Sequence, residues 1–120
     1  MRLIIIALIY FSTATDVFSQ GHKEAWSAGA GATTCGEFAG YYRSNPTNTM
    51  TGYISWAQGF MTAQNLTRSI LKRQTHNLGG LSSSDQAARL RAFCNQKPLA
   101  DFMDAVEALY EELPLLPQSN

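Results

Sequence analysis

The chain has 120 residues, two cysteines, nine basic and nine acidic side chains, and therefore a formal net charge of zero. This length predicts a single domain, and the hydrophobic content of 45% argues against a disordered chain. The balanced charge argues against a protein that binds nucleic acid or a membrane surface through a basic patch, and two cysteines are too few for a disulfide-rich scaffold.

Residues 1–19 have the pattern of a secretory signal peptide. Arg2 supplies a positive start, residues 3–11 form an apolar run, and small residues follow. We prefer cleavage after Ser19, with cleavage after Ala14 as the alternative. A transmembrane anchor is disfavoured because the run has about half of the ~20 apolar residues that a bilayer requires. The protein is therefore expected to be periplasmic or secreted, with no membrane anchor after signal cleavage.

The folded domain is predicted to span residues 33–113, after a flexible leader that is rich in Gly, Ala and Ser at residues 20–32. Its first helix opens with a capping box, in which Thr34 is the N-cap and Glu37 occupies the third helical position. This helix ends before residue 44. Residues 44–52 (SNPTNTMTG) predict a turn-rich loop.

The two cysteines, Cys35 and Cys94, are predicted to form a structural disulfide. An exported chain meets an oxidising compartment, and two cysteines allow one intramolecular pairing. Closing a loop of about 60 residues stabilises a fold by roughly 4 kcal/mol. A reactive thiol is the alternative, but the chain has no C-x-x-C motif, and neither cysteine has a His or Lys beside it.

The second helix is predicted over residues 53–75. Tyr53, Trp56, Phe60 and Ile70 recur at helical spacing. Gly59 lies inside this helix, where a glycine costs roughly 1 kcal/mol relative to alanine. We expect it to allow the close approach of another helix or of a bulky ring.

Two further helices follow a flexible connection at residues 76–84. Residues 85–95 predict a third helix capped by Ser83 or Ser84. A fourth helix is expected to begin near Pro98 at its first position and to run to Leu113, with Leu99 in its apolar stripe and its acidic side chains on the opposite face. Residues 114–120 form a C-terminal tail. The sequence thus predicts an all-α, compact bundle of about four helices, with one disulfide that joins the first helix to the third.

No arrangement of side chains predicts catalysis or a cofactor. His22 and His76 lie in Gly-rich segments without a second ligand at helical spacing, so no metal site is expected. The carboxylates of the last helix are interpreted as a solvated face. The glycosylation pattern at Asn65 falls within a helix and is disfavoured. We expect that the protein is not an enzyme.

Aromatic side chains exceed what a small four-helix core needs. Most are expected in the core, and any exposed ones would mark a surface for protein contacts. They are Tyr41, Tyr42, Tyr53, Trp56, Phe60 and Tyr110.

The chain resembles the small secreted proteins of the Rap/Tai type, the immunity proteins of bacterial type VI secretion systems. The residues that carry this resemblance are TCGEF at 34–38, YISWAQGF at 53–60 with Asn65 beyond it, LRAFC at 90–94 and KPL at 97–99. It covers residues 33–113 and marks Trp56, Gly59, Asn65 and Pro98 as structural positions of the family motif.

The resemblance implies a periplasmic inhibitor that binds a protein partner such as a peptidoglycan amidase effector, often as a homodimer. Loops 44–52 and 76–84 are the candidate contact elements, and no individual partner-binding residue is predicted. The Rap/Tai proteins are similar in turn to the HdeA/HdeB acid-stress chaperones. The alternative function is therefore a periplasmic chaperone that loosens in acid and binds client proteins.

Overall fold

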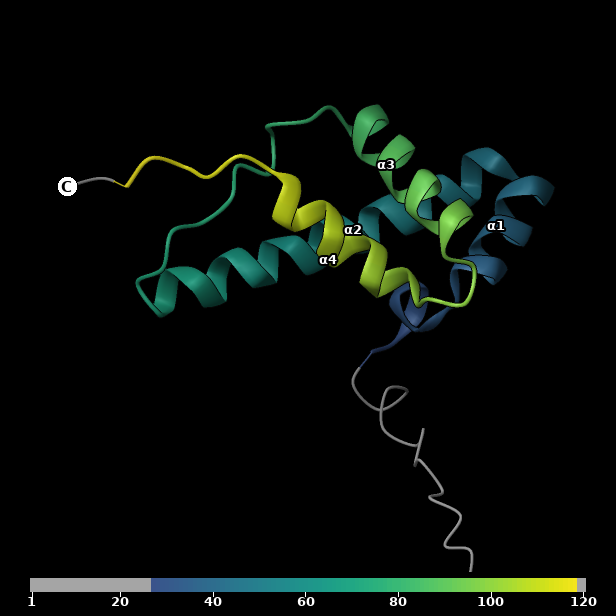
Figure 1. Cartoon of the computed structure of the whole chain (residues 1–120), viewed down its shortest axis with the longest axis horizontal. Helices are drawn as coiled ribbons and strands as arrows, with labels where there is room; N and C mark the ends of the chain where they lie inside the picture. Colours follow the sequence, from purple (N-terminus) through teal and green to yellow (C-terminus); the bar gives the residue numbers. More distant parts are fainter. Residues whose placement is uncertain (1–26, 119–120) are drawn as a thin grey trace, which may run out of the picture.

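A computed structural model describes residues 27–118 (Figure 1). Within this range the fold is all-α, as predicted, and its β-bridges are the isolated pairs Thr34–Asp101 and His76–Leu115. The predicted signal peptide, residues 1–19, lies outside the described residues. The elements are a 3₁₀-helix η1 (Gly29–Ala32) and four α-helices, α1 (Cys35–Ser44), α2 (Pro46–Ile70), α3 (Ser83–Gln96) and α4 (Phe102–Glu112).

The predicted disulfide between Cys35 and Cys94 is confirmed. It joins the first residue of α1 to the last turn of α3, with the two Cα atoms 4.7 Å apart. Both side chains are buried in the core. The single covalent cross-link of the described chain therefore lies inside the hydrophobic core and holds the start of α1 against the last turn of α3.

The start of α1 is paired with the loop that connects α3 and α4. The Cys35 amide donates to the Ala100 carbonyl (2.8 Å) and the Gly36 amide to the Pro98 carbonyl (2.9 Å), while the Phe102 amide donates to Thr33 (2.8 Å). A Cβ on residue 36 would lie 3.3 Å from the Pro98 oxygen, so glycine suits this approach. These bonds satisfy amides that a helix N-terminus leaves unpaired.

This pairing explains why the expected start of α4 near Pro98 is wrong. Residues 97–101 instead form a turn, closed by a hydrogen bond from the Ala100 amide to the Lys97 carbonyl (3.1 Å), whose Pro98 and Ala100 carbonyls accept from α1, and α4 begins only at Phe102. Asp101 is its N-cap, in a capping box with Asp104. Leu99 is consequently not in the apolar stripe but is 94% exposed. The capping box of Thr34 and Glu37 at the start of α1 is as predicted.

The predicted loop at residues 44–52 is helical except at Asn45. α2 starts at Pro46, with the Asn45 side chain accepting from the Asn48 amide, and it ends at Ile70 rather than at residue 75. The turn-forming residue types are accommodated because their hydroxyls bond to carbonyls one turn back, as Thr51 does to Thr47 at 2.9 Å. A proline at the first helical position, with an asparagine cap before it, starts a helix as readily as it marks a turn.

α3 also begins earlier than predicted. Its N-cap is Ser82, which accepts from the Asp85 amide, and neither Ser83 nor Ser84 takes this role. The Ser82 hydroxyl also donates to the Asp85 carboxylate at 2.7 Å. Three consecutive serines offer the same capping group, and the turn that precedes the helix decides which one caps.

The aromatic cluster between α1, α2 and α4 forms much of the core. Phe38, Tyr53 and Phe102 lie with ring centroids 4.7–5.0 Å apart. The Tyr53 hydroxyl is 2.9 Å from that of Thr33, and burial of this side chain raises the pKa of its hydroxyl. The prediction that most aromatic residues are core is confirmed, since Tyr41 alone of the six has more than half of its surface exposed.

Trp56 lies against η1, the end of the predicted flexible leader. Its indole N–H donates to the Ala28 carbonyl at 3.0 Å, and its ring stacks on Phe60. A Cβ on Gly31 would lie 2.0 Å from the Trp56 ring, whereas a Cβ on Gly59 would have no neighbour within 4 Å. The close approach expected at Gly59 therefore occurs at Gly31, which is buried against Trp56.

These two glycines give a matched pair of substitutions. Gly31→Ala should lower the free energy of unfolding by roughly 1–3 kcal/mol, because the methyl group would displace the indole. Gly59→Ala should raise it by roughly 0.5–1 kcal/mol, because the site is open and helical. Urea unfolding followed by circular dichroism measures both values. Equal effects of the two substitutions would contradict this packing.

The cap of α1 should make stability depend on pH. The Thr34 backbone N–H and hydroxyl donate to the Glu37 carboxylate (2.7 and 3.0 Å), and these bonds hold its pKa below the ordinary value of 4.5. Because its pKa is lower in the folded state, the ionised carboxylate stabilises the fold above pH 4.5. This stabilisation is lost as the pH falls through the lowered pKa.

Glu37→Gln should therefore lower the free energy of unfolding at pH 7 and have a smaller effect at pH 3. Urea unfolding at the two pH values measures the difference. Glu107→Gln, at an exposed position in α4, is the control and should alter stability little at either pH. A Glu37→Gln effect that is the same at both pH values would count against the charged cap.

Candidate protein-binding surface

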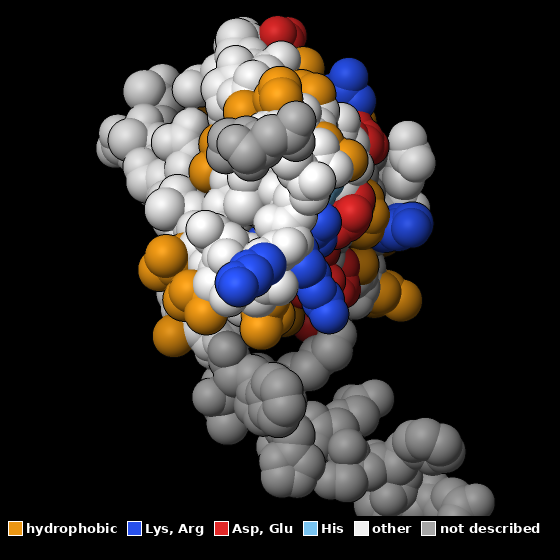
Figure 2. Space-filling view, turned by 90° about the vertical axis from the view of Figure 1, so that its left-hand side faces the viewer, with side chains coloured by type: hydrophobic (Ala, Val, Ile, Leu, Met, Phe, Trp, Pro, Cys, Tyr) orange, Lys and Arg blue, Asp and Glu red, His pale blue; other side chains and the backbone are white. Residues whose placement is uncertain are grey.

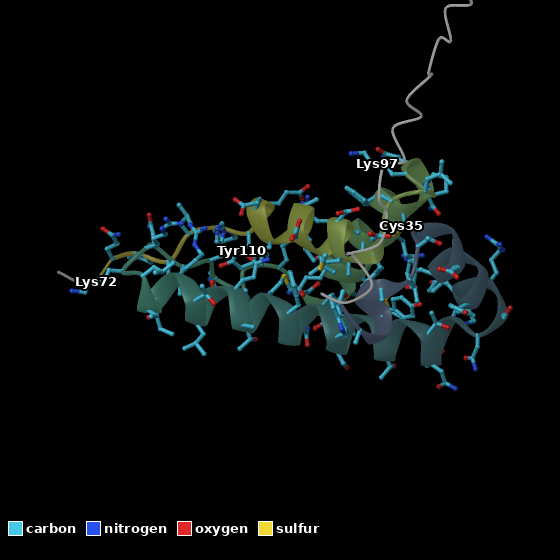
Figure 3. The ribbon with its side chains drawn as sticks, turned by 90° about the horizontal axis from the view of Figure 1, so that it is seen from below. Cys35, Lys72, Lys97 and Tyr110 are labelled. Carbon is cyan, nitrogen blue, oxygen red and sulfur yellow. A yellow bond between two sulfur atoms is a disulfide. The ribbon has the colours of Figure 1, made fainter. Side chains whose placement is uncertain are left out.

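α2 extends well beyond its neighbours. Its 25 residues correspond to a length of about 37 Å, whereas α1, α3 and α4 have 10, 14 and 11 residues. The C-terminal end of α2 lies on the side of the molecule opposite the disulfide, as the positions of Lys72 and Cys35 show (Figure 3). At this end, extended segments rather than α1 and α3 cover the helix (Figure 1).

The end of α2 is closed by a Schellman motif. The Lys72 amide donates to the Ser69 carbonyl (3.0 Å) and the Arg73 amide to the Arg68 carbonyl (2.8 Å), with Lys72 at a φ of 54°. Glycine is the usual residue in this left-handed conformation, because a Cβ there costs of the order of 1 kcal/mol. The fold thus places a lysine in an unfavourable left-handed conformation immediately after the last turn of α2.

A polar cluster fixes the following segment to α2 and α4. Asn65 donates to the His76 carbonyl (2.8 Å) and accepts from the His76 amide (3.0 Å) and from the Tyr110 hydroxyl (2.6 Å). Tyr110 lies between α4 and α2 (Figure 3). Burial raises the pKa of its hydroxyl, which therefore stays protonated and able to donate at neutral pH. One amide side chain thus joins three segments.

His76 is buried in this cluster, although the sequence predicted a flexible connection. It retains 4% exposure, contacts the Tyr110 ring at a centroid distance of 4.3 Å, and places Nδ1 2.8 Å from the Leu113 carbonyl. A carbonyl only accepts, so Nδ1 carries the proton. Backbone hydrogen bonds also fix part of the predicted C-terminal tail, because the Asn77 amide donates to the Pro114 carbonyl and the Leu116 amide to the Thr75 carbonyl.

Large apolar side chains are exposed at the end of α2. Leu66 and Ile70, one helical turn apart, are 62% and 72% exposed, and Leu71 is 56% exposed. Leu116 is brought to the same end by a hydrogen bond of its carbonyl from the Gln74 side chain (2.7 Å). Figure 2, which looks onto this end, shows hydrophobic side chains beside Lys and Arg side chains.

Two neighbouring cations lie at this end of α2. Lys72 and Arg73 line a cavity of about 350 Å³ together with Leu116 and Pro117, and neither cation has an ion pair within residues 27–118. No Asp or Glu occurs between residues 38 and 84, while residues 98–120 contain five acidic and no basic residues. A net charge of zero therefore hides a basic α2 end and an acidic α4.

We define the α2-end surface as the exposed apolar side chains and cations at this end of the molecule. Its members are Leu66, Ile70, Leu71, Lys72, Arg73 and Leu116. The spacing in the sequence placed all of these except Leu116 within a helix expected to run to residue 75, so their exposure at a helix end was not predicted. The signal that could have found them is the acid-free stretch from 38 to 84.

The residues on which the resemblance was based occupy different places. Trp56 packs on η1, Asn65 centres the polar cluster, and the Pro98 carbonyl accepts from α1, while Gly59 is exposed and without neighbours. Of the candidate contact loops, 76–84 is a loop up to residue 82 and lies beyond the end of α2, whereas 44–52 is largely helix. These residues therefore do not converge on one site.

Within residues 27–118, no three His, Cys, Asp or Glu side chains are grouped as metal ligands would be, and no helix is long and apolar enough to cross a membrane. Comparison with family models, with curated proteins and with solved structures finds no match for this chain. The described residues form a small all-helical domain with one disulfide.

Removal of the Asn65 side chain should loosen the support of the α2-end surface. Asn65→Ala leaves the backbone of His76 and the Tyr110 hydroxyl without partners, at a cost of roughly 2–3 kcal/mol. Gln64→Ala, at the neighbouring position on α2, is the control and should cost less than about 0.5 kcal/mol. Urea unfolding measures both, and hydrogen exchange at the His76 amide reports the local opening. Equal effects would contradict a central role for Asn65.

Proposed function

We propose that the protein is an exported protein-binding module that acts by covering the surface of a partner protein. The observation that carries this proposal is the α2-end surface, where exposed Leu66, Ile70 and Leu71 lie beside Lys72 and Arg73. Contiguous exposed apolar groups flanked by charges are typical of sites of protein association. The backbone of this helix end is already held through Asn65 and therefore loses little entropy on binding.

The charge of this surface favours an acidic partner. The cations have no internal carboxylate partner within the described chain, so a partner that brings Asp or Glu would gain charge-assisted hydrogen bonds and faster association. An inhibitor of this kind is what the resemblance to the Rap/Tai immunity proteins implies. The partner would then be an effector such as a peptidoglycan amidase, in the periplasm or outside the cell.

The alternative, an acid-activated periplasmic chaperone, is favoured by a different observation. Carboxylates cap two helices, with Glu37 at the start of α1 and Asp101 and Asp104 at the start of α4. Protonation removes the charge that these caps present to helix dipoles. Strong acid would thereby loosen the ends of α1 and α4 and expose core side chains to client proteins.

Site-specific photo-crosslinking distinguishes these functions. A photoreactive phenylalanine analogue replaces Ile70 in the full chain, and in a matched variant it replaces Ala88, which is exposed on α3. At neutral pH the probe at Ile70 should cross-link one predominant protein that the probe at Ala88 does not. Cross-links to many proteins that form only near pH 3 would favour the chaperone, and the absence of any site-dependent cross-link would contradict both.

Two variants then separate binding from stability. Ile70→Glu should weaken binding of the identified partner at least tenfold without unfolding the protein, because the side chain is exposed. Lys72→Gly should stabilise the fold by roughly 0.5–1 kcal/mol, because it relieves the left-handed residue, and should still weaken binding. Calorimetric titration and urea unfolding measure the two quantities. Unchanged binding in both variants would exclude the α2-end surface.

A further inference from the structure

A second surface lies far from the end of α2, in a groove between α1, the first half of α2 and α3. The groove has a volume of about 400 Å³. Met50, Ile54 and Ala87 provide its apolar lining, and hydroxyl side chains that include those of Thr47 and Ser83 also line it. A hydrogen bond from the Gln58 side chain to Ser83 (3.4 Å) joins the two helices beside it.

Arg91 gives the groove a fixed positive charge. Its guanidinium lies over the Tyr42 ring, 5.1 Å from the centroid, and donates to the Tyr42 hydroxyl at 3.1 Å. Arg91 and Tyr42 both line the groove, and no carboxylate within residues 27–118 forms an ion pair with Arg91. Stacking and the hydrogen bond hold the guanidinium in place, and its other N–H groups remain able to donate.

We propose that this groove binds a short peptide segment of a partner protein in which an acidic side chain lies within a few residues of a large apolar one. The apolar lining takes the apolar side chain, and Arg91 takes the carboxylate with charge-assisted hydrogen bonds. The hydroxyls can both donate to and accept from a peptide backbone. The groove lies between helices and is open to solvent, which suits a peptide, and its volume is at the small end of the range for ligand sites.

This proposal goes beyond the proposed function, because it concerns a surface that the α2-end residues do not reach. The charge and the apolar contacts of the groove come from residues on α1, α3 and the first half of α2, none of which belongs to the α2-end surface. The two surfaces can therefore be tested separately, and failure of one leaves the other unaffected.

The probe is a library of random 12-residue peptides displayed on phage, selected at neutral pH against the full, oxidised protein. Enriched peptides should contain Asp or Glu within four residues of a Leu, Ile, Met or Phe. Amide chemical shifts of the labelled protein should change at Met50, Ile54 and Arg91. Shifts confined to residues 66–73 would place the peptides on the α2-end surface and would overturn the groove proposal, as would the absence of any enriched peptide.

Variants of Arg91 complete the test. Arg91→Gln should weaken binding of an enriched peptide at least tenfold, and replacement of the peptide's acidic residue by its amide should do the same. Arg43→Gln removes an exposed charge of α1 outside the groove and should change affinity less than twofold. Arg91→Lys retains the charge without the planar stacking and should be intermediate. Circular dichroism verifies folding, and full affinity in Arg91→Gln with retained fold would overturn the proposal.

Discussion

The cross-link between Cys35 and Cys94 and the backbone pairing around it determine the rest of the fold. The disulfide places the start of α1 against the end of α3, and the chain that leaves α3 then passes directly over the first amides of α1. Its carbonyls satisfy those amides, so residues 97–101 remain a turn outside the helix and α4 begins at Phe102. That register carries the Phe102 ring into the aromatic cluster beneath α1. One end of the molecule is therefore defined by a covalent bond, three hydrogen bonds and a ring cluster.

The opposite end is held by polar groups instead. The Asn65 side chain connects α2 to the segment that returns from its end and to Tyr110 of α4. Because α2 is held at both ends, its last turn projects as a firm support for exposed Leu66, Ile70 and the cations beyond them. A segregated charge distribution, basic at the end of α2 and acidic along α4, gives this surface an electrostatic character that the net charge of the chain does not reveal.

Local signals in the sequence predicted much of this fold and little of the candidate site. The capping box at Thr34 and the helical class could be predicted because they depend on local chemistry. The disulfide could be predicted because two cysteines allow one intramolecular pairing. The start of α4 could not, because the Pro98 carbonyl is engaged by Gly36, which is distant in sequence. The same holds for Gly31, whose need to be glycine arises only from Trp56. The α2-end surface could be predicted only if the end of the helix were known, and that end depends on Lys72 adopting a left-handed conformation.

The stability of the oxidised protein relative to a variant without the disulfide tests the central claim most directly. A double variant, Cys35→Ala with Cys94→Ala, removes the cross-link from a loop that spans 59 residues of sequence. Urea unfolding should give a free energy of unfolding lower by about 4 kcal/mol, and the reduced native sequence should be destabilised to a similar degree. A double variant as stable as the oxidised protein would show that the cross-link does not determine the fold.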